Sequence, residues 1–467
     1  MAPRFSSTKT STGRSSERRS SMERPVLRWS DRVASPRLAL MLTVAVLLSG
    51  CLGGLQPPGF QGIGRGQAPD KPEQTRLFAA EGSTAAFPVM DDLRSRQSVL
   101  PAGGSYAAVA QAVMLASGGA SAAELQMAKL QKEAVDKNWL PQIGPVVTLD
   151  SLGVMAAKLV AEQALLDNGR RRAERAVAAA DVEVAAVSLA EDTNDRVRQG
   201  LELYIAAEKA RAQAAVASRG VERLSAYQDM VQQRVTGGLS DRSELQVVSQ
   251  KRAEMQATYS GDMQSAERSL NDLASLAGRP LAGLRGIEPL GQGRAEPLSV
   301  MRAKSEGARV LALARAERAG SLPGLAATAS LDGGGSFLSG LQLGGANIGF
   351  GTGAKLRALN ATPDLVERRF AEARLESGQR IDSLGGEIAE LRLRRSQGAE
   401  VLRQTMGNLD LFVEQYKAGL RSLVELVGQY DAALRLERDQ VALDYEIARR
   451  EVEVAAMQGL LVHGAPM

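Results

Sequence analysis

The sequence predicts a mainly α-helical protein with a small membrane β part, built from two copies of a long helical hairpin unit. Three observations support this fold class. Aromatic residues make up only 4% of the chain, a composition that favours long helices packed through small side chains over a large globular core. Residues 170–235 and 363–418 contain few helix-breaking residues. Landmarks in the first half recur 181 or 182 positions later, which indicates an internal duplication.

The first fifty residues have the pattern of a signal peptide. Basic residues such as Arg28 and Arg37 precede the apolar run Leu38–Leu48, which is too short to span a bilayer. Leu48-Ser49-Gly50-Cys51 resembles the lipobox of bacterial lipoproteins. We therefore predict cleavage before Cys51 and a covalent lipid on its thiol. The alternative is an ordinary thiol beside a signal peptide.

Charge and residue usage exclude several classes of function. Residues 1–50 carry nine Lys or Arg and three acids, so their net charge of +6 leaves 4 − 6 = −2 for the rest of the chain. A nucleic-acid partner is therefore not expected. With Cys51 acylated and His463 as the single histidine, disulfides, metal sites, cofactors other than the lipid and a His-based triad are not expected either. We predict no enzymatic activity.

The chain divides into segments by composition and by its duplication. Pro and Gly are frequent after Cys51, which is typical of a linker. The predicted segments are residues 1–50 as signal peptide with lipobox, 51–100 as lipid-anchored linker and lead-in, 101–280 as the first repeat, 281–320 as a linking segment with shorter helices, 321–462 as the second repeat and 463–467 as a C-terminal tail.

Two pairs of landmarks define the repeat. Leu140-Pro141 corresponds to Leu322-Pro323 at an offset of 182. Gly238-Leu239 corresponds to Gly419-Leu420 at an offset of 181. In both repeats a Glu-Leu pair begins six residues after this glycine. Each repeat is expected to hold a strand hairpin followed by a helical hairpin.

The strands are predicted from alternation with a period of two. Apolar residues at odd positions from Leu325 to Leu331 alternate with small or polar ones, so one face suits lipid and the other suits water. A half-buried strand of a soluble protein has the same pattern. After the glycines at 333–335, residues 346–351 are predicted to return as the partner strand, and residues 158–166 are the corresponding strand of the first repeat.

The helical hairpins are predicted from uninterrupted helical stretches that end at glycine. Residues 170–235 and 363–418 are expected to form helices approaching about 100 Å at 1.5 Å per residue. Gly238 and Gly419 supply the left-handed conformation at the turns. The return helices are expected over residues 239–277 and 423–461.

Four strands per chain have open edges, which leave backbone groups unsatisfied in a bilayer. A membrane barrel therefore requires assembly, and the sequence does not choose the number of copies.

Local motifs add a resemblance to a known family. Leu140-Pro141-Gln142, the junction Leu165–Arg170 and the spacing Tyr416-x-x-Gly419-x-x-Ser422-x-x-Glu425 are similar to the first strand, the strand-to-helix junction and the second hairpin tip of TolC-like outer-membrane efflux proteins. The resemblance implies a homotrimer with a trimeric α-barrel and a twelve-stranded β-barrel. It also implies a location in the outer membrane extending into the periplasm, contact with outer-membrane lipid, and partners in a periplasmic adaptor and an inner-membrane transporter. Drug efflux and protein secretion both fit such a duct.

The same resemblance implies a gate at the periplasmic tips. The matching residues are Tyr416 and Arg421 on the second hairpin and Ser243 and Glu244 on the first. A phenol can donate a hydrogen bond to a carboxylate, and a guanidinium to a hydroxyl or carbonyl. Glu425 would add a ring of three negative charges that favours cations.

A second interpretation needs no barrel. A periplasmic lipoprotein with a coiled-coil hairpin, acting as an adaptor or spacer, would have the same long helices and would use the alternating segments as soluble strands.

Overall fold

The computed structural model describes residues 88–149, 155–281, 283–344 and 349–464. The predicted signal peptide, Cys51, most of the 51–100 segment and the last three residues lie outside this range. Among the described residues, no helix is both long and apolar enough to cross a membrane.

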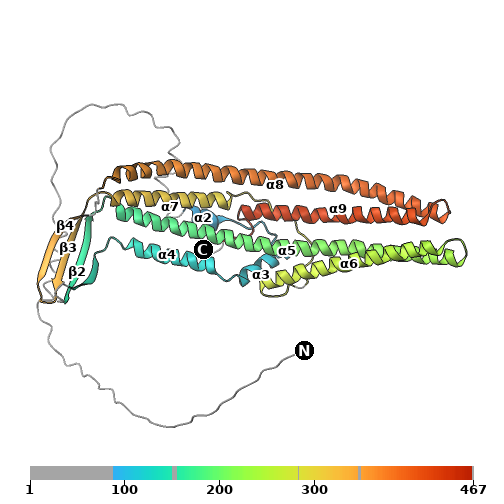
Figure 1. Ribbon diagram of the computed structural model, residues 1–467, viewed down its shortest axis with the longest axis horizontal. Coiled ribbons are helices and arrows are strands. Elements are labelled where there is room, and N and C mark those ends of the chain that lie inside the picture. Colours follow the sequence, from blue (N-terminus) through green and yellow to red (C-terminus); the bar gives the residue numbers. More distant parts are fainter. Residues whose placement is uncertain (1–87, 150–154, 282, 345–348, 465–467) are drawn as a thin grey trace, which may run out of the picture. The chain divides into compact units, whose positions relative to one another are not determined.

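The element order repeats once along the chain (Figure 1). The first repeat contains β1 (Gln142–Leu149), β2 (Met155–Leu166), α5 (Arg170–Thr236) and α6 (Arg242–Ala277). The second repeat contains β3 (Gly324–Asp332), β4 (Phe337–Gly344), α8 (Thr352–Lys417) and α9 (Leu423–Met457). A helix precedes each sheet hairpin, α4 (Ala120–Asp136) before β1 and α7 (Leu298–Gly320) before β3. The short helices α2 (Pro88–Ser95) and α3 (Ser105–Ala116) come first.

The two long helices confirm the predicted hairpins, with one boundary wrong. α5 has 67 residues and α8 has 66. α8 begins at Thr352 rather than at Pro363, which lies inside the helix. The prediction placed the proline in the first turn, where it is best tolerated. The preceding residues are nevertheless helical and bond to α7, through Lys355 to Glu317 at 3.2 Å and Asn360 to Arg318 at 3.3 Å.

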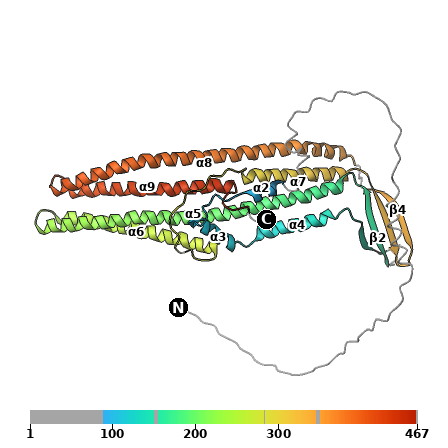
Figure 2. The same ribbon diagram turned by 180° about the vertical axis from the view of Figure 1, so that it is seen from behind.

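The helices form a layer with α5 in its interior (Figures 1 and 2). α5 contacts α4 and α6 on one side and α7 and α9 on the other, while α8 contacts α7 and α9. Small side chains allow these close approaches. The buried face of α5 is accordingly rich in alanine, including Ala178, Ala186, Ala207 and Ala217. α3 packs on one surface of this layer, where Tyr106 and Val109 meet Leu201 and Tyr204 of α5.

The two ends of the described chain are joined beside this core. The Val99 amide donates to the Leu460 carbonyl at 2.9 Å. The buried Arg96 guanidinium donates to the Gln458 carbonyl at 2.5 Å. His463 Nδ1 accepts from the Ser98 amide at 3.2 Å, so the histidine contacts the chain near α2.

The four strands form one antiparallel sheet in the order β1-β2-β3-β4. The predicted return strand at residues 346–351 is wrong, because β4 occupies Phe337–Gly344. The physical reason is the turn. Asp332 Oδ1 accepts from the Gly334 and Ser336 amides at 3.0 and 2.8 Å, and Gly335 adopts φ +83°, so the chain reverses at once. β2 likewise begins at Met155, three residues before the predicted start.

Candidate functional site

The sheet has two chemically different faces. Cross-strand register places Ile143 opposite Ala161, Ala161 opposite Ala329, and Ala329 opposite Ser339, so these residues share one face. Apolar side chains dominate that face: Ile143, Pro145, Val147, Met155, Ala157, Leu159, Ala161, Leu325, Ala327, Ala329, Leu331, Phe337, Leu341 and Leu343. The three charged residues of the strands, Lys158, Glu162 and Asp332, all lie on the opposite face. The predicted division into a lipid-suited and a water-suited face is therefore present.

The apolar face is exposed within the single chain. Leu341 and Leu343 are 70% and 76% exposed, and Ile143 is 67% exposed. Soluble monomers rarely expose apolar patches of this extent. The outer strands β1 and β4 each have only one neighbour in the sheet, so each presents an unpaired edge. Both features indicate a sheet that is completed by other molecules.

The two helical hairpins turn in the same way at their tips. Gly238 and Gly419 have φ of +72° and +74°, which confirms the left-handed turns. The amides of Leu239 and Leu420 donate to the carbonyls of Arg234 and Gln415 at 2.8 and 2.9 Å. These hydrogen bonds satisfy carbonyl groups at the C-terminal ends of α5 and α8. The two bonds occupy equivalent positions of the two repeats, 181 residues apart.

The return helices begin at side-chain caps just beyond the glycines. Asp241 accepts from the Ser243 amide at 3.3 Å, so Ser243 belongs to the cap of α6. Ser422 and Glu425 form a capping box, with the Glu425 amide donating to Ser422 Oγ at 3.3 Å and the Ser422 amide donating to Glu425 Oε2 at 3.2 Å. The caps explain why α6 begins at Arg242 rather than at the predicted residue 239.

The predicted gate residues form two separate groups within one chain. Arg421 donates to Gln415 at 3.1 Å, lies 3.7 Å from Glu425 and stacks on the Phe412 ring at 4.8 Å. All of these partners belong to its own hairpin. Tyr416, by contrast, is buried in a core shared by the two hairpins, with Val231 and Leu426 among its members.

Tyr416 lies beside residues of the first hairpin. Its pKa is raised, first by burial and then by the negative charge of Glu244, while Arg234 acts in the opposite direction. The Arg234 guanidinium lies over the Tyr416 ring, 5.1 Å from its centroid. Glu244 itself accepts a hydrogen bond from Ser240 Oγ. Tyr416 therefore lies within electrostatic reach of Glu244, but among the described residues no hydrogen bond joins its hydroxyl to that carboxylate. Ser243 and Arg421 are held by their own hairpins.

Arg234 is the tip residue that sequence reasoning missed. A basic residue in the last turn of a helix is ordinarily explained by the helix dipole. The offset of 181 also aligns it with Gln415, which is uncharged. Only the meeting of the two hairpin tips places it over an aromatic ring.

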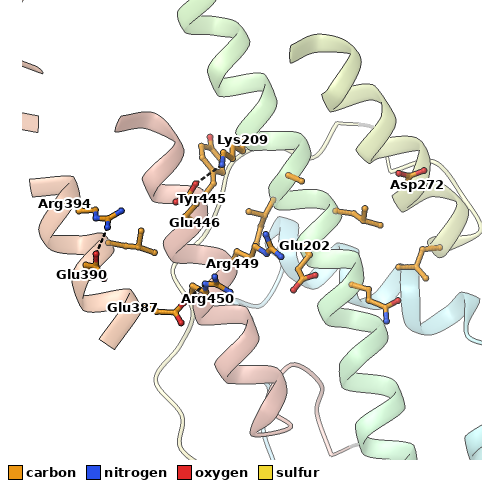
Figure 3. Close-up of a pocket in the computed structure, with 16 residues that line it drawn as sticks. Glu202, Lys209, Asp272, Glu387, Glu390, Arg394, Tyr445, Glu446, Arg449 and Arg450 are labelled. Carbon is orange, nitrogen blue, oxygen red and sulfur yellow. Dashed lines mark hydrogen bonds and ion pairs between the residues drawn. The ribbon is translucent and has the colours of Figure 1, made fainter. Parts of the chain in front are cut away.

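A groove of about 980 Å³ crosses the helical layer on the surface away from α3 (Figure 3). It is lined by residues of α5, α6, α8 and α9, and ion pairs border it: Lys209–Glu446 at 2.9 Å, Arg394–Glu390 at 2.5 Å and Arg450–Glu387 at 3.0 Å. Its α5 residues, such as Glu202 and Ala206, lie on the helix face opposite Leu201 and Tyr204, which contact α3. Ion pairs therefore border the groove, while apolar side chains such as Leu203 and Leu276 line much of its surface.

Comparison with solved structures identifies the fold. The chain matches CusC, whose structures describe transmembrane channel formation, with a TM-score of 0.66, 13% identity and coverage of 77% of this chain and 96% of CusC. It matches the outer membrane protein VceC of Vibrio cholerae with a TM-score of 0.64, 12% identity and coverage of 76% and 96%. It matches the MtrE outer membrane channel of Neisseria gonorrhoeae, in its open state, with a TM-score of 0.61, 16% identity and coverage of 81% and 90%.

The fold is that of the TolC-like outer-membrane channels, as the sequence motifs predicted. At these identities the likeness concerns the fold alone. No protein-family model matches the sequence, and a search of curated proteins finds no relative.

Proposed function

We propose that the chain is one protomer of an outer-membrane exit duct, a passive conduit through which an inner-membrane transporter expels its substrates. The observation that carries this proposal is the sheet, whose exposed apolar face and charged opposite face are suited to lipid and to a water-filled lumen. The fold shared with outer-membrane channels supports it.

Assembly follows from the open strand edges. An even number of antiparallel strands per protomer gives β1 and β4 opposite directions. The β4 edge of one protomer can therefore pair antiparallel with the β1 edge of the next, and three copies would give twelve strands. The helical layers would then close into the wall of a tunnel in the periplasm. A homotrimer is the proposed form.

The anchor, the partners and the gate complete the proposal. A lipid on Cys51 would anchor the protein in the outer membrane in addition to the barrel. The hairpin tips would meet a periplasmic adaptor and an inner-membrane transporter, and they would keep the resting duct closed. Tyr416, Arg421, Glu425, Glu244 and Ser243 are the proposed gate residues, with Gly238 and Gly419 at the turns.

The adaptor or spacer interpretation receives less support. Soluble strands would cover their apolar face with other parts of the chain, yet this face is largely exposed on β1, β2 and β4 and only partly covered on β3. The adaptor interpretation also leaves the open edges of β1 and β4 unexplained.

Single-channel recording in planar bilayers tests the conduit. Because the tips are proposed to close the resting duct, the purified protein is measured as wild type and as Arg421→Ser, which removes the contacts of Arg421 with Gln415 and Glu425. We expect brief openings from the wild type and larger or longer openings from the variant. Protein that is shown to be inserted in vesicles but gives no conductance in either form would contradict the proposal.

Intact-mass analysis of membrane-purified protein tests the anchor. We expect the mass of a chain that begins at an acylated Cys51, and loss of the lipid mass in Cys51→Ser. An unmodified Cys51 in the wild type would refute the lipidation proposal and leave the duct proposal standing.

A further inference from the structure

Basic residues are concentrated where three helices meet the sheet (Figure 1). α5 begins shortly after β2, α7 ends shortly before β3, and α8 begins beside the end of α7, where Lys355 pairs with Glu317 at 3.2 Å. The first six residues of α5 and of α8 and the last six of α7 contain eight Lys or Arg and two acids, a net charge of +6. We call these eight basic residues the basic collar: Arg170, Arg171, Arg172, Arg175, Arg315, Arg318, Lys355 and Arg357.

The collar stands out against the charge of the rest of the chain. Residues 51–467 have a net charge of −2, so those outside the three helix ends carry −2 − 6 = −8. The end of α4, which also leads to a strand, is balanced, because Lys132 and Lys137 pair with Asp136 and Glu133 of their own helix. The positive charge is therefore local to α5, α7 and α8.

Helix stability does not explain the arginines at the starts of α5 and α8. The N-terminal end of a helix carries partial positive charge and favours acids. Neither helix has an acid in its first turn, and α5 begins with three consecutive arginines, Arg170–Arg172. α6 and α9, which begin at the tips, follow the ordinary rule, with Glu244 and Glu425 in their first turns. The basic residues beside the sheet thus oppose the helix dipoles.

Within the chain these charges are only partly neutralised. Arg170 pairs with Glu174 at 2.9 Å, and Arg171 lies within electrostatic reach of Asp167. Among the described residues, no hydrogen bond or ion pair is found for the side chains of four members of the collar: Arg172, Arg175, Arg315 and Arg357. Three of these four are exposed, and Arg175 is half-buried. The collar therefore presents unpaired guanidinium groups to its surroundings.

Exposed apolar side chains adjoin the collar. Leu166, the last residue of β2, lies on the apolar sheet face and is exposed, as is Leu322 between α7 and β3. Trp139, between α4 and β1, is 58% exposed. Asn138 Nδ2 donates to the Arg171 carbonyl at 3.3 Å, so Trp139 lies near the start of α5. Tryptophan is enriched where the lipid tails meet the headgroups.

We propose that the basic collar binds the headgroups of anionic phospholipids in the leaflet that borders the helices. The inference rests on the proposed duct, because it takes the apolar face of the sheet to lie in a bilayer. An apolar band that ends at unpaired arginines follows the order of a leaflet, in which acyl tails give way to phosphate groups. Guanidinium groups donate paired hydrogen bonds to phosphate. A bound headgroup also offsets the repulsion between the arginines and the helix N-termini.

Such binding would set the depth of the sheet in the bilayer. Arginine and lysine are costly at the midplane and tolerated near the interface, so the collar cannot follow the strands into the apolar layer. Attraction to anionic headgroups would hold the collar at the surface. The strands would then be kept at one depth from the side of the helices.

Trp139 reports which lipids lie at the collar. It is the only tryptophan after the predicted signal peptide, and the other, Trp29, lies within that segment. The full chain is reconstituted in phosphatidylcholine vesicles that contain a fixed fraction of brominated phosphatidylglycerol or, in parallel, of brominated phosphatidylcholine. Bromine quenches tryptophan fluorescence at contact, so the ratio of the two quenching curves gives the enrichment of the anionic lipid. Trp139→Phe protein supplies the background.

The wild type should prefer the anionic lipid. We expect phosphatidylglycerol to be enriched about twofold to fivefold over phosphatidylcholine around Trp139. The preference should hold at about 0.1 M salt and disappear at about 1 M, because exposed charges are then screened.

Matched variants locate the preference in the collar. Arg172→Gln combined with Arg357→Gln removes two exposed charges, one from each helix start, and should lower the enrichment by at least about half. Because these arginines oppose the helix dipoles, this variant should unfold at the same temperature as wild type or higher. Arg252→Gln combined with Arg268→Gln removes two exposed charges from α6, which begins at a tip, and should keep the wild-type preference.

Three results would overturn the collar. One is equal quenching by the two brominated lipids in the wild type. Another is a wild-type preference in the collar variant. The third is a collar variant that unfolds at a lower temperature or fails to fold, because the arginines would then stabilise the chain or its contact with a neighbouring copy. Arg172→Lys combined with Arg357→Lys keeps both charges and should retain most of the preference. Absence of quenching by either lipid would contradict the duct proposal as well, so the two failures are distinguished.

Discussion

At the scale of single residues, Glu183 links burial to stability. Glu183, on α5, is 7% exposed, and its carboxylate accepts a hydrogen bond from the Val89 amide, at the start of α2, at 3.1 Å. Burial raises its pKa above the ordinary value of 4.5, against the effects of the Val89 bond and of Lys304. Desolvation therefore dominates at this position.

The raised pKa of Glu183 gives a pH-dependent prediction. The folded state binds this proton more tightly than the unfolded state, so the contribution of Glu183 to stability falls as the pH rises from 4.5 through its folded pKa. Glu183→Gln keeps an acceptor for Val89, and we expect it to unfold at a higher temperature than wild type at pH 7 and at the same temperature at pH 3. Melting followed by circular dichroism measures this.

Glu133 is the control for this measurement. Its pKa is lowered by the hydrogen bond from Lys137, so Glu133→Gln should show the opposite sign, slightly less stable at pH 7. Equal pH profiles for wild type and Glu183→Gln would contradict the burial argument.

Glu425 gives a prediction about ion selectivity. Its carboxylate is exposed at the start of α9, and three copies would place three negative charges around one tip. Glu425→Gln should lower the cation-to-anion permeability ratio, measured as a reversal potential closer to zero in a salt gradient. Glu414→Gln, exposed in the last turn of α8 and already paired with Lys417, is the charge-matched control and should change the ratio less.

At the scale of elements, sequence pattern predicted what depends on local chemistry. Alternation at Leu325, Ala327, Ala329 and Leu331 predicted β3 and its faces, and the glycines at 238 and 419 predicted both tip turns. β4 was misplaced, because a turn closed by the Asp332 side chain cannot be distinguished from a longer glycine loop by composition. The Arg234–Tyr416 stack was missed because it depends on how two helices pack, 182 residues apart in sequence.

The turn glycines allow a test without steric complications. A Cβ at Gly419 would meet nothing within 4 Å, so Gly419→Ala costs only the strain of φ +74°, about 1 kcal/mol. Gly407→Ala is the matched control, also in open space but inside α8, where alanine should stabilise by about 0.5–1 kcal/mol. Thermal unfolding of both variants checks the opposite signs, and destabilisation by Gly407→Ala would contradict the argument.

The two faces of β3 give a second test at this scale. Ala329 lies on the apolar face and Thr328, its neighbour, on the other. Ala329→Lys should destabilise the inserted protein by about 2–4 kcal/mol if it lies near the bilayer midplane, whereas Thr328→Lys should be tolerated. Urea titration of protein folded in vesicles measures the difference. Equal tolerance at both positions would show that this face does not meet lipid.

At the scale of the whole molecule, the unpaired edges of β1 and β4 decide what the chain can be. A sheet with an exposed apolar face and two free edges is unstable in water and unsatisfied in a bilayer. Adding copies of the same chain satisfies both edges and keeps the strands antiparallel throughout. The duct is thus proposed as a property of the assembly, and the single protomer supplies its wall, its lipid-facing surface and its tips.

Native mass spectrometry of the full chain, extracted from membranes in detergent, tests this central claim most directly. We predict a mass of three copies that persists on dilution, because each protomer closes the strand edges of its neighbours. A stable single copy that retains its strand and helix content would contradict the claim, because a four-stranded sheet with open edges would then be the complete molecule.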